Sequence, residues 1–114
     1  MSEENDLKKI IIKKLDILEA LGLLLFERIN SGSISNRVRG ARKGTADIII
    51  AVPPSAKLIA LELKSKTGKQ SCAQSSYQEK VERIGGEYFL IRTSSEFDQM
   101  LKKIIPKYGA NYDK

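Results

Sequence analysis

The sequence predicts an α/β domain in which a mixed sheet is flanked by helices. Apolar residues repeat with helical spacing over residues 3–21 and again over 71–84. Between these segments, Ile48-Ile49-Ile50-Ala51-Val52 is apolar on both faces, which is typical of a strand in the interior of a sheet. The helix at 71–84 separates the last two expected strands, and such a crossover allows them to pair in parallel.

The first helix is expected over residues 3–21. Ser2 is placed to cap its start, and Gly22 is placed to end it. Charged residues lie away from the centre of its apolar stripe, so one face is expected to pack on the sheet. The stripe consists of Leu7, Ile10, Ile11, Leu15, Leu18 and Leu21.

Three strands are expected next, over residues 23–30, 45–52 and 58–64. A polar, basic loop over 31–44 separates the first two. Pro53-Pro54 ends the second strand because proline cannot donate to a sheet ladder. Only a short turn joins the second strand to the third, so we expect these two strands to pair as a hairpin.

The second half of the chain is expected to form a helix, a strand and a helix. The helix at 71–84 carries an apolar stripe and ends at Gly85-Gly86, and the strand covers 87–93. The pattern Thr93-Ser94-Ser95-Glu96 has the form of a capping box, and Pro106 ends the third helix. The stripe of the second helix is Ala73, Tyr77, Val81 and Ile84, and the buried face of the third is Phe97, Met100, Leu101 and Ile104.

The chain has 114 residues, which is the size of one domain. We expect this domain over residues 1–106, followed by a flexible tail over 107–114. The apolar runs are much shorter than the ~20 residues that a membrane-spanning helix requires. The N-terminus is acidic where a signal peptide is basic, so we expect a cytoplasmic protein.

Two features of the composition exclude classes of chemistry. The sequence contains no histidine, which excludes Ser-His-Asp and Cys-His catalysis and histidine-ligated metals. Its single cysteine, Cys72, excludes a disulfide within the chain and a cysteine-rich zinc site. An enzyme with this composition would depend on carboxylates, lysines, hydroxyls and a hard cation such as Mg²⁺.

The formal net charge of +6 favours anionic partners, with nucleic acid ahead of a membrane surface. Five cations and no acid occur between Arg28 and Ala46. This stretch is either a solvated basic loop or an arm that contacts phosphates, and the residues themselves leave both interpretations open. The cations concerned include Arg37, Arg39, Arg42 and Lys43.

Two acids lie in strongly apolar strands. Asp47 comes at the start of the Ile48–Val52 run, and Glu62 lies within 58–64. A buried carboxylate is costly unless it is paired or binds a metal. Glu62 and Lys64 are two residues apart and share a face of the strand, and the hairpin brings Asp47 beside Glu62. These residues form either a same-face ion pair plus a strand-end acid, or a reactive cluster at one end of the sheet.

The order and spacing of these residues resemble those of the VRR-NUC family, the virus-type replication-repair nucleases, within the PD-(D/E)XK nuclease superfamily. The match covers roughly residues 4–104. The resemblance implies a restriction-endonuclease-like αβββαβ core with an additional C-terminal helix. The matching segments are Gly44-Thr45-Ala46-Asp47-Ile48, Leu61-Glu62-Leu63-Lys64, Gly68-Lys69-Gln70-Ser71-Cys72-Ala73-Gln74 and Gly85-Gly86.

The resemblance also implies roles for individual residues. Asp47 and Glu62, with the carbonyl group of Leu63, would bind Mg²⁺ or Mn²⁺. Lys64 would orient the attacking water or stabilise the developing negative charge. DNA contacts are expected from Arg37, Arg39, Arg42, Lys43, Lys66 and Lys69.

Two further residues of the implied site also have plain structural explanations. Gln74 is placed in the catalytic site, although Ser71 and Gln74 by themselves form a capping box, and the two roles are compatible. The family has a metal-binding glutamate on its first helix, for which Glu3 and Glu4 are candidates. Acids in a first turn also simply favour the helix dipole. The spacing of the family favours Glu4.

The implied activity is that of a metal-dependent, structure-selective DNA endonuclease in phage replication, recombination or repair, with a Holliday junction among its candidate substrates. The alternatives are a less selective nuclease that cuts single strands or nicks duplexes, and a catalytically idle nucleic-acid-binding module. A homodimer is expected, because resolving a junction takes two symmetric cuts. The apolar run Leu23-Leu24-Leu25-Phe26 offers a surface for it, unless both faces of the run pack under helices.

Overall fold

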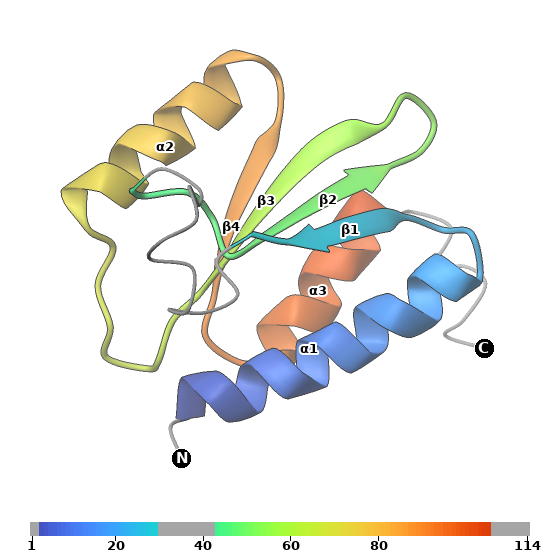
Figure 1. The fold of residues 1–114 in the computed structure, drawn as a ribbon, viewed down its shortest axis with the longest axis horizontal. Helices are drawn as coiled ribbons and strands as arrows, with labels where there is room; N and C mark the ends of the chain where they lie inside the picture. The colour runs from blue at the N-terminus through green and yellow to red at the C-terminus, as the bar shows by residue number, and fades with distance from the viewer. Residues whose placement is uncertain (1–2, 30–42, 106–114) are drawn as a thin grey trace, which may run out of the picture.

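The structure is a computed structural model that describes residues 3–29 and 43–105 (Figure 1). For Glu3 and Glu4 it describes the backbone but not the side chains. The expected order of helices and strands is confirmed. The elements are α1 (Glu3–Ala20), β1 (Leu25–Arg28), β2 (Ile48–Val52), β3 (Lys57–Leu63), α2 (Cys72–Arg83), β4 (Glu87–Ile91) and α3 (Ser94–Ile104).

The strands form one mixed sheet in the order β1-β2-β3-β4. The pairs β1–β2 and β2–β3 are antiparallel, and β3–β4 is parallel. The predicted hairpin, the predicted crossover and the interior place of the Ile48–Val52 strand are therefore all confirmed. β1 is shorter than the 23–30 strand expected from the sequence, and it lies at one edge of the sheet.

The helices lie on both faces of the sheet (Figure 1). α1 and α3 pack on one face, which we call the α1/α3 face. α2 packs on β3 and β4 on the other face, which we call the α2 face. Among the described residues, none of the helices is long and apolar enough to span a bilayer.

The main core fills the α1/α3 face. Phe97, Ile11 and Leu15 are completely buried there against alternate residues of β2 and β3. The predicted buried face of the third helix is confirmed in full. The stripe of the first helix is confirmed for Leu7, Ile11, Leu15 and Leu18.

Three apolar residues that the sequence placed on buried stripes are exposed. Ile10 is 45% exposed because it lies well to one side of the helix face that carries Leu7, Ile11 and Leu18. Leu21 is 55% exposed, since α1 ends at Ala20 and Leu21 is in the turn that follows. Ile84 is 75% exposed, since α2 ends at Arg83 and Ile84 is its C-terminal cap. In each case the apolar stripe drawn from the sequence was too wide or too long.

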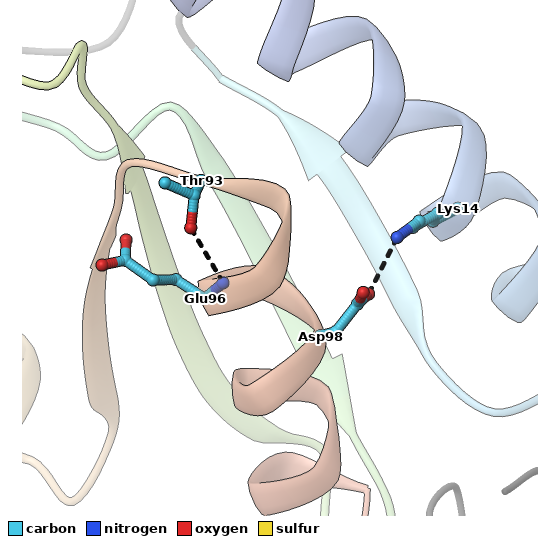
Figure 2. A network of polar contacts seen from close by, with 4 residues as sticks. All are labelled: Lys14, Thr93, Glu96 and Asp98. Carbon is cyan, nitrogen blue, oxygen red and sulfur yellow. Dashed lines mark hydrogen bonds and ion pairs between the residues drawn. The ribbon is translucent and has the colours of Figure 1, made fainter.

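Polar contacts fix where the third helix begins and how it meets the first (Figure 2). The Thr93 side chain accepts a hydrogen bond from the Glu96 backbone N at 3.1 Å, as the capping box predicted. The Glu96 carboxylate instead accepts from the backbone N of Arg92 at 2.7 Å, one residue before the cap. Lys14 and Asp98 form an ion pair at 2.8 Å that joins α1 to α3.

Candidate functional site

Asp47 and Glu62 lie opposite each other at one end of the sheet. Ile48 pairs with Leu61 in the β2–β3 ladder, so extending the register by one residue sets Asp47 across from Glu62. Both alternate with residues of the main core and therefore point to the α2 face. Glu62 is only 4% exposed, and Asp47 is half-buried.

Gln74 connects the buried carboxylate to the start of α2. Its Nε2 donates to Glu62 Oε2 at 2.8 Å, and its Oε1 accepts from the backbone N of Ser71 at 2.8 Å. Ser71 completes a capping box by accepting from the Gln74 backbone N. One side chain therefore makes both contacts: its oxygen takes part in the helix cap and its nitrogen binds Glu62, while the catalytic role of Gln74 stays a prediction.

Asp47 is held by both neighbouring strands. Its backbone carbonyl accepts from Ile29 N at 2.8 Å, just beyond the end of β1. Its carboxylate Oδ2 accepts from Leu63 N at 2.8 Å, at the end of β3. In a strand, the N–H and C=O of one residue point to the same neighbour, so the Leu63 carbonyl is also directed toward Asp47.

Gly44 allows the segment before Asp47 to approach the first turn of α2. Its φ of +91° lies in the left-handed region that favours glycine. A Cβ at this position would stand 2.4 Å from the carbonyl oxygen of Ala73, the residue before Gln74. The glycine of the Gly44-x-x-Asp47 pattern thus brings the segments that carry Asp47 and Gln74 close together.

Comparison with known proteins was made at the level of sequence and of fold. No protein-family model and no curated protein matches this chain. A solved structure described as "VRR_NUC domain" matches with a TM-score of 0.57 and 20% sequence identity, covering 98% of this chain and 99% of that one. The chain has the fold of a VRR_NUC domain. The fold that the sequence resemblance implied is thereby confirmed.

Within this VRR_NUC fold, Lys64 lies on the same face as Glu62, two residues further along. Its backbone N donates to the carbonyl of Ile91 at 3.1 Å, so the end of β3 stays joined to β4 beyond the last ladder pair. The Lys64 side chain is half-buried. The structure therefore brings Asp47, Glu62 and Gln74 together and sets Lys64 on the same side of the sheet.

The predicted DNA-contacting cations are only partly described. Lys66 and Lys69 are exposed on the loop between β3 and α2, and Lys43 is exposed one residue before Gly44. Lys43 lies beside Lys80 in a shallow hollow against α2. Arg37, Arg39 and Arg42 lie outside the described residues. Glu4 is in the first turn of α1, but its side chain is not described.

Arg92 is a residue of this region that the sequence did not point to. Its Nη1 donates to the carbonyl oxygens of Ser65 at 2.7 Å and Gly68 at 2.6 Å, with a longer contact of 3.4 Å to Lys66 O. Arg92 follows β4 directly and shares the face of Leu90, the residue that pairs with Glu62. Only the register of the β3–β4 pair would have predicted the position of Arg92 beside this loop, because no sequence motif marks the residue.

Tyr88 was also missed, and it lies deeper in the same face. Its ring is buried with Ala60 and Val81, and its hydroxyl makes no hydrogen bond of good geometry with the described residues, although Gln70 lies beside it. Burial raises the pKa of the Tyr88 phenol above its ordinary value. The Gln70 side chain partly offsets that increase, whereas the negative charges of Glu62 and Asp47 add to it.

The donor set fits a hard cation. Carboxylates directly opposite each other on one face repel, and burial adds to the cost, so a bound cation would relieve both effects. The described part of the chain gathers no three His, Cys, Asp or Glu side chains at one point. The further ligands that the sequence resemblance implies are the Leu63 carbonyl and Glu4, and the side chain of Glu4 is not described. Two carboxylates and a carbonyl are all oxygen donors, the type that Mg²⁺ prefers.

Proposed function

We propose that this chain is a metal-dependent nuclease that hydrolyses phosphodiester bonds in DNA. The observation that carries the proposal is the convergence of Asp47, Glu62 and Gln74, with Lys64 on the same face, in a VRR_NUC fold. Neither part suffices alone, because a fold hosts many functions and an isolated pair of acids has structural explanations.

Asp47, Glu62 and the Leu63 carbonyl would hold Mg²⁺ or Mn²⁺. When bound, such a cation lowers the pKa of a water molecule and stabilises charge on the phosphoryl oxygens. Gln74 fixes the orientation of Glu62 through the 2.8 Å hydrogen bond to Oε2. Leu63 N does the same for Asp47 through Oδ2. Lys64 supplies a positive charge that orients the attacking water or stabilises the phosphorane-like transition state.

DNA is the substrate class that the charge of the chain favours. A net charge of +6 and the exposed Lys43, Lys66 and Lys69 support contact with phosphates. We extend the proposal to a structure-selective endonuclease that acts on branched DNA, including Holliday junctions, during phage replication, recombination or repair in the cytoplasm of a bacterial or infected cell. A less selective nicking or single-strand nuclease is the second candidate, because the exposed cations carry no base-reading pattern.

A panel of labelled substrates tests the activity and its selectivity together. The protein is incubated with Mg²⁺ or Mn²⁺ and a single strand, a duplex, a flap or a four-way junction, with Glu62→Gln as the matched control. We expect junction cleavage that depends on the cation and is lost in the control. Equal cleavage of all substrates would favour the less selective nuclease. Binding without cleavage of any substrate would contradict the proposal and favour an idle binding module.

A homodimer would supply the two symmetric cuts that resolve a junction. Support comes from β1, which lies at the edge of the sheet, and from Leu25, which is 55% exposed on it. Ile17 and Leu21 on α1 are also exposed apolar residues. Sedimentation at micromolar concentration, with and without junction DNA, measures the mass. A mass of 12.7 kDa without DNA, together with only one chain bound per junction in its presence, would contradict the dimer.

A further inference from the structure

The loop over residues 64–71 separates the end of β3 from the start of α2, and Arg92 lies beside it. Parallel pairing of Leu63 with Ile91 places Arg92 next to Lys64 on the α2 face. Two neighbouring cations on one face repel each other unless one is engaged elsewhere. The guanidinium of Arg92 donates to backbone carbonyls of this loop, whose oxygens offset part of its positive charge.

Arg92 and the loop form a compact turn. Ser65 and Gly68 both present their carbonyl oxygens to Nη1, at 2.7 Å and 2.6 Å. Gly68 N closes the turn by donating to Ser65 Oγ at 3.1 Å and to Ser65 O at 3.3 Å. Hydrogen bonds from a charged donor are about twice as strong as neutral ones, so the guanidinium holds this turn together.

Gly68 passes this constraint on to Lys64. A Cβ built on Gly68 would stand 3.2 Å from Ser65 Oγ and 3.4 Å from Lys64 Cδ, so one methyl group would fill the space between the turn and the aliphatic part of the lysine. Arg92 binds the carbonyl oxygens of Ser65 and Gly68, and Ser65 follows Lys64 directly in the chain. The backbone that Arg92 holds therefore begins at the residue next to the lysine and returns beside its side chain.

We propose that Arg92 is a positioning residue for Lys64. By fixing the Ser65–Gly68 turn, it would restrict the side chain of Lys64 to the side of the sheet that carries Asp47 and Glu62. The proposal rests on the nuclease function proposed above. A displacement of about 1 Å in such a group can lower a rate about 100-fold, so the expected effect is on the chemical step.

Two substitutions of Arg92 separate its charge from the placement of its donor nitrogen. Arg92→Gln removes the charge and shortens the side chain, whereas Arg92→Lys keeps the charge but replaces the planar guanidinium, whose Nη1 reaches both carbonyls, with a differently placed ammonium group. Arg83→Gln, at an exposed position in the last turn of α2, is the matched control. Three quantities are measured: the single-turnover cleavage rate, the DNA affinity, and the hydrogen exchange of the backbone amides over 65–70.

We expect Arg92→Gln to lower the single-turnover rate by roughly 10- to 100-fold and to speed exchange over residues 65–70, with DNA affinity within about twofold. The cleavage rate and the exchange rate of Arg92→Lys should fall between those of Arg92→Gln and the wild type. Both rates of Arg83→Gln should match those of the wild type. A lower melting temperature with an unchanged rate would make Arg92 purely structural. Weaker DNA binding with an unchanged rate would make it a DNA contact.

Gly68→Ala tests the same connection from the other side. Its added methyl group would stand 3.2 Å from Ser65 Oγ and in van der Waals contact with Lys64 Cδ at 3.4 Å, without touching the carbonyl oxygens that bind Arg92. It narrows the space open to the lysine, so we expect a slower cleavage step with a near-normal exchange rate over residues 65–70. An unchanged cleavage rate would break the proposed path. If the wild type cleaves no substrate, the nuclease function fails, and the exchange data for Arg92→Gln still decide whether Arg92 holds the loop.

Discussion

The α1/α3 face and the α2 face of the sheet bury different kinds of side chain. On the α1/α3 face, β2 and β3 present Ile48, Ile50 and Leu61, all fully buried under two helices. On the α2 face, β3 presents Ala60 and the buried acid Glu62, β2 presents the half-buried Ile49, and Ala46 lies buried just before β2. This face packs against one helix and holds the smaller apolar cluster. The larger apolar core therefore lies on the α1/α3 face, whereas the chemistry proposed above would lie on the α2 face.

The largest expected effect is on activity, from changes confined to the α2 face. Asp47→Ala, Glu62→Ala and Lys64→Ala should each lower cleavage by about 10⁴-fold or more, which corresponds to over ~5 kcal/mol of transition-state stabilisation. The fold should persist, because replacing either of the two facing acids relieves repulsion and because Lys64 is only half-buried. Cleavage assays paired with circular dichroism check this expectation, and unfolding of all three variants would contradict the catalytic assignment.

The largest expected effect on stability comes from the α1/α3 face. Phe97 on α3 is completely buried, so Phe97→Ala should lower the free energy of unfolding by about 3–5 kcal/mol through lost contacts and a cavity. Urea denaturation measures the change. Ile84→Ala, at a position that is 75% exposed, is the control and should change stability by less than about 0.5 kcal/mol. Similar losses in both variants would remove the contrast between the core and the surface.

Gly44→Ala should affect both stability and cleavage, because this residue joins the strand end to α2. The added methyl group meets the Ala73 carbonyl at 2.4 Å in a left-handed backbone conformation, so we expect a loss of about 2–3 kcal/mol and slower cleavage. Gly22→Ala is the matched control, since it has a φ of +76° with nothing within 4 Å of the new methyl group. It should cost about 1 kcal/mol and leave cleavage unchanged.

The smallest expected effect is that of replacing Tyr88 on the free energy of unfolding, and this effect depends on pH. Because burial raises the pKa of the Tyr88 phenol, the unfolded chain releases this proton near pH 10 while the folded chain retains it. The unfolded state then binds fewer protons, so this contribution to stability is present below pH ~10 and is lost as the pH rises above it. In urea titrations, the stability of Tyr88→Phe should therefore rise relative to that of the wild type as the pH increases from 9 to 11. Parallel pH profiles would contradict this expectation.

The sequence predicted the order of helices and strands because the spacing of apolar residues, whether helical or alternating, depends only on neighbouring positions in the chain. It also predicted that Asp47 lies beside Glu62 and that Lys64 shares the face of Glu62, since a hairpin fixes its own register and a strand alternates its faces. Ile10 and Leu21 were assigned wrongly because the width of a buried stripe depends on what packs against it, and its length on where the helix ends. Arg92 escaped notice because a single cation after a strand has no local signature. Its partners, Ser65 and Gly68, are brought to it only by parallel pairing of β3 with β4.

The hydrogen bond from Gln74 to Glu62 makes two parts of the molecule mutually dependent. The first turn of α2 and the buried carboxylate share one amide group, so fraying of the helix start releases Glu62, and a reoriented Glu62 loosens the helix start. Such a coupling is reciprocal by thermodynamic necessity. A ligand that fixes the Glu62 carboxylate would therefore also slow the opening of the first turn of α2. Hydrogen exchange of the first backbone amides of α2 would then indicate whether Glu62 is held in place.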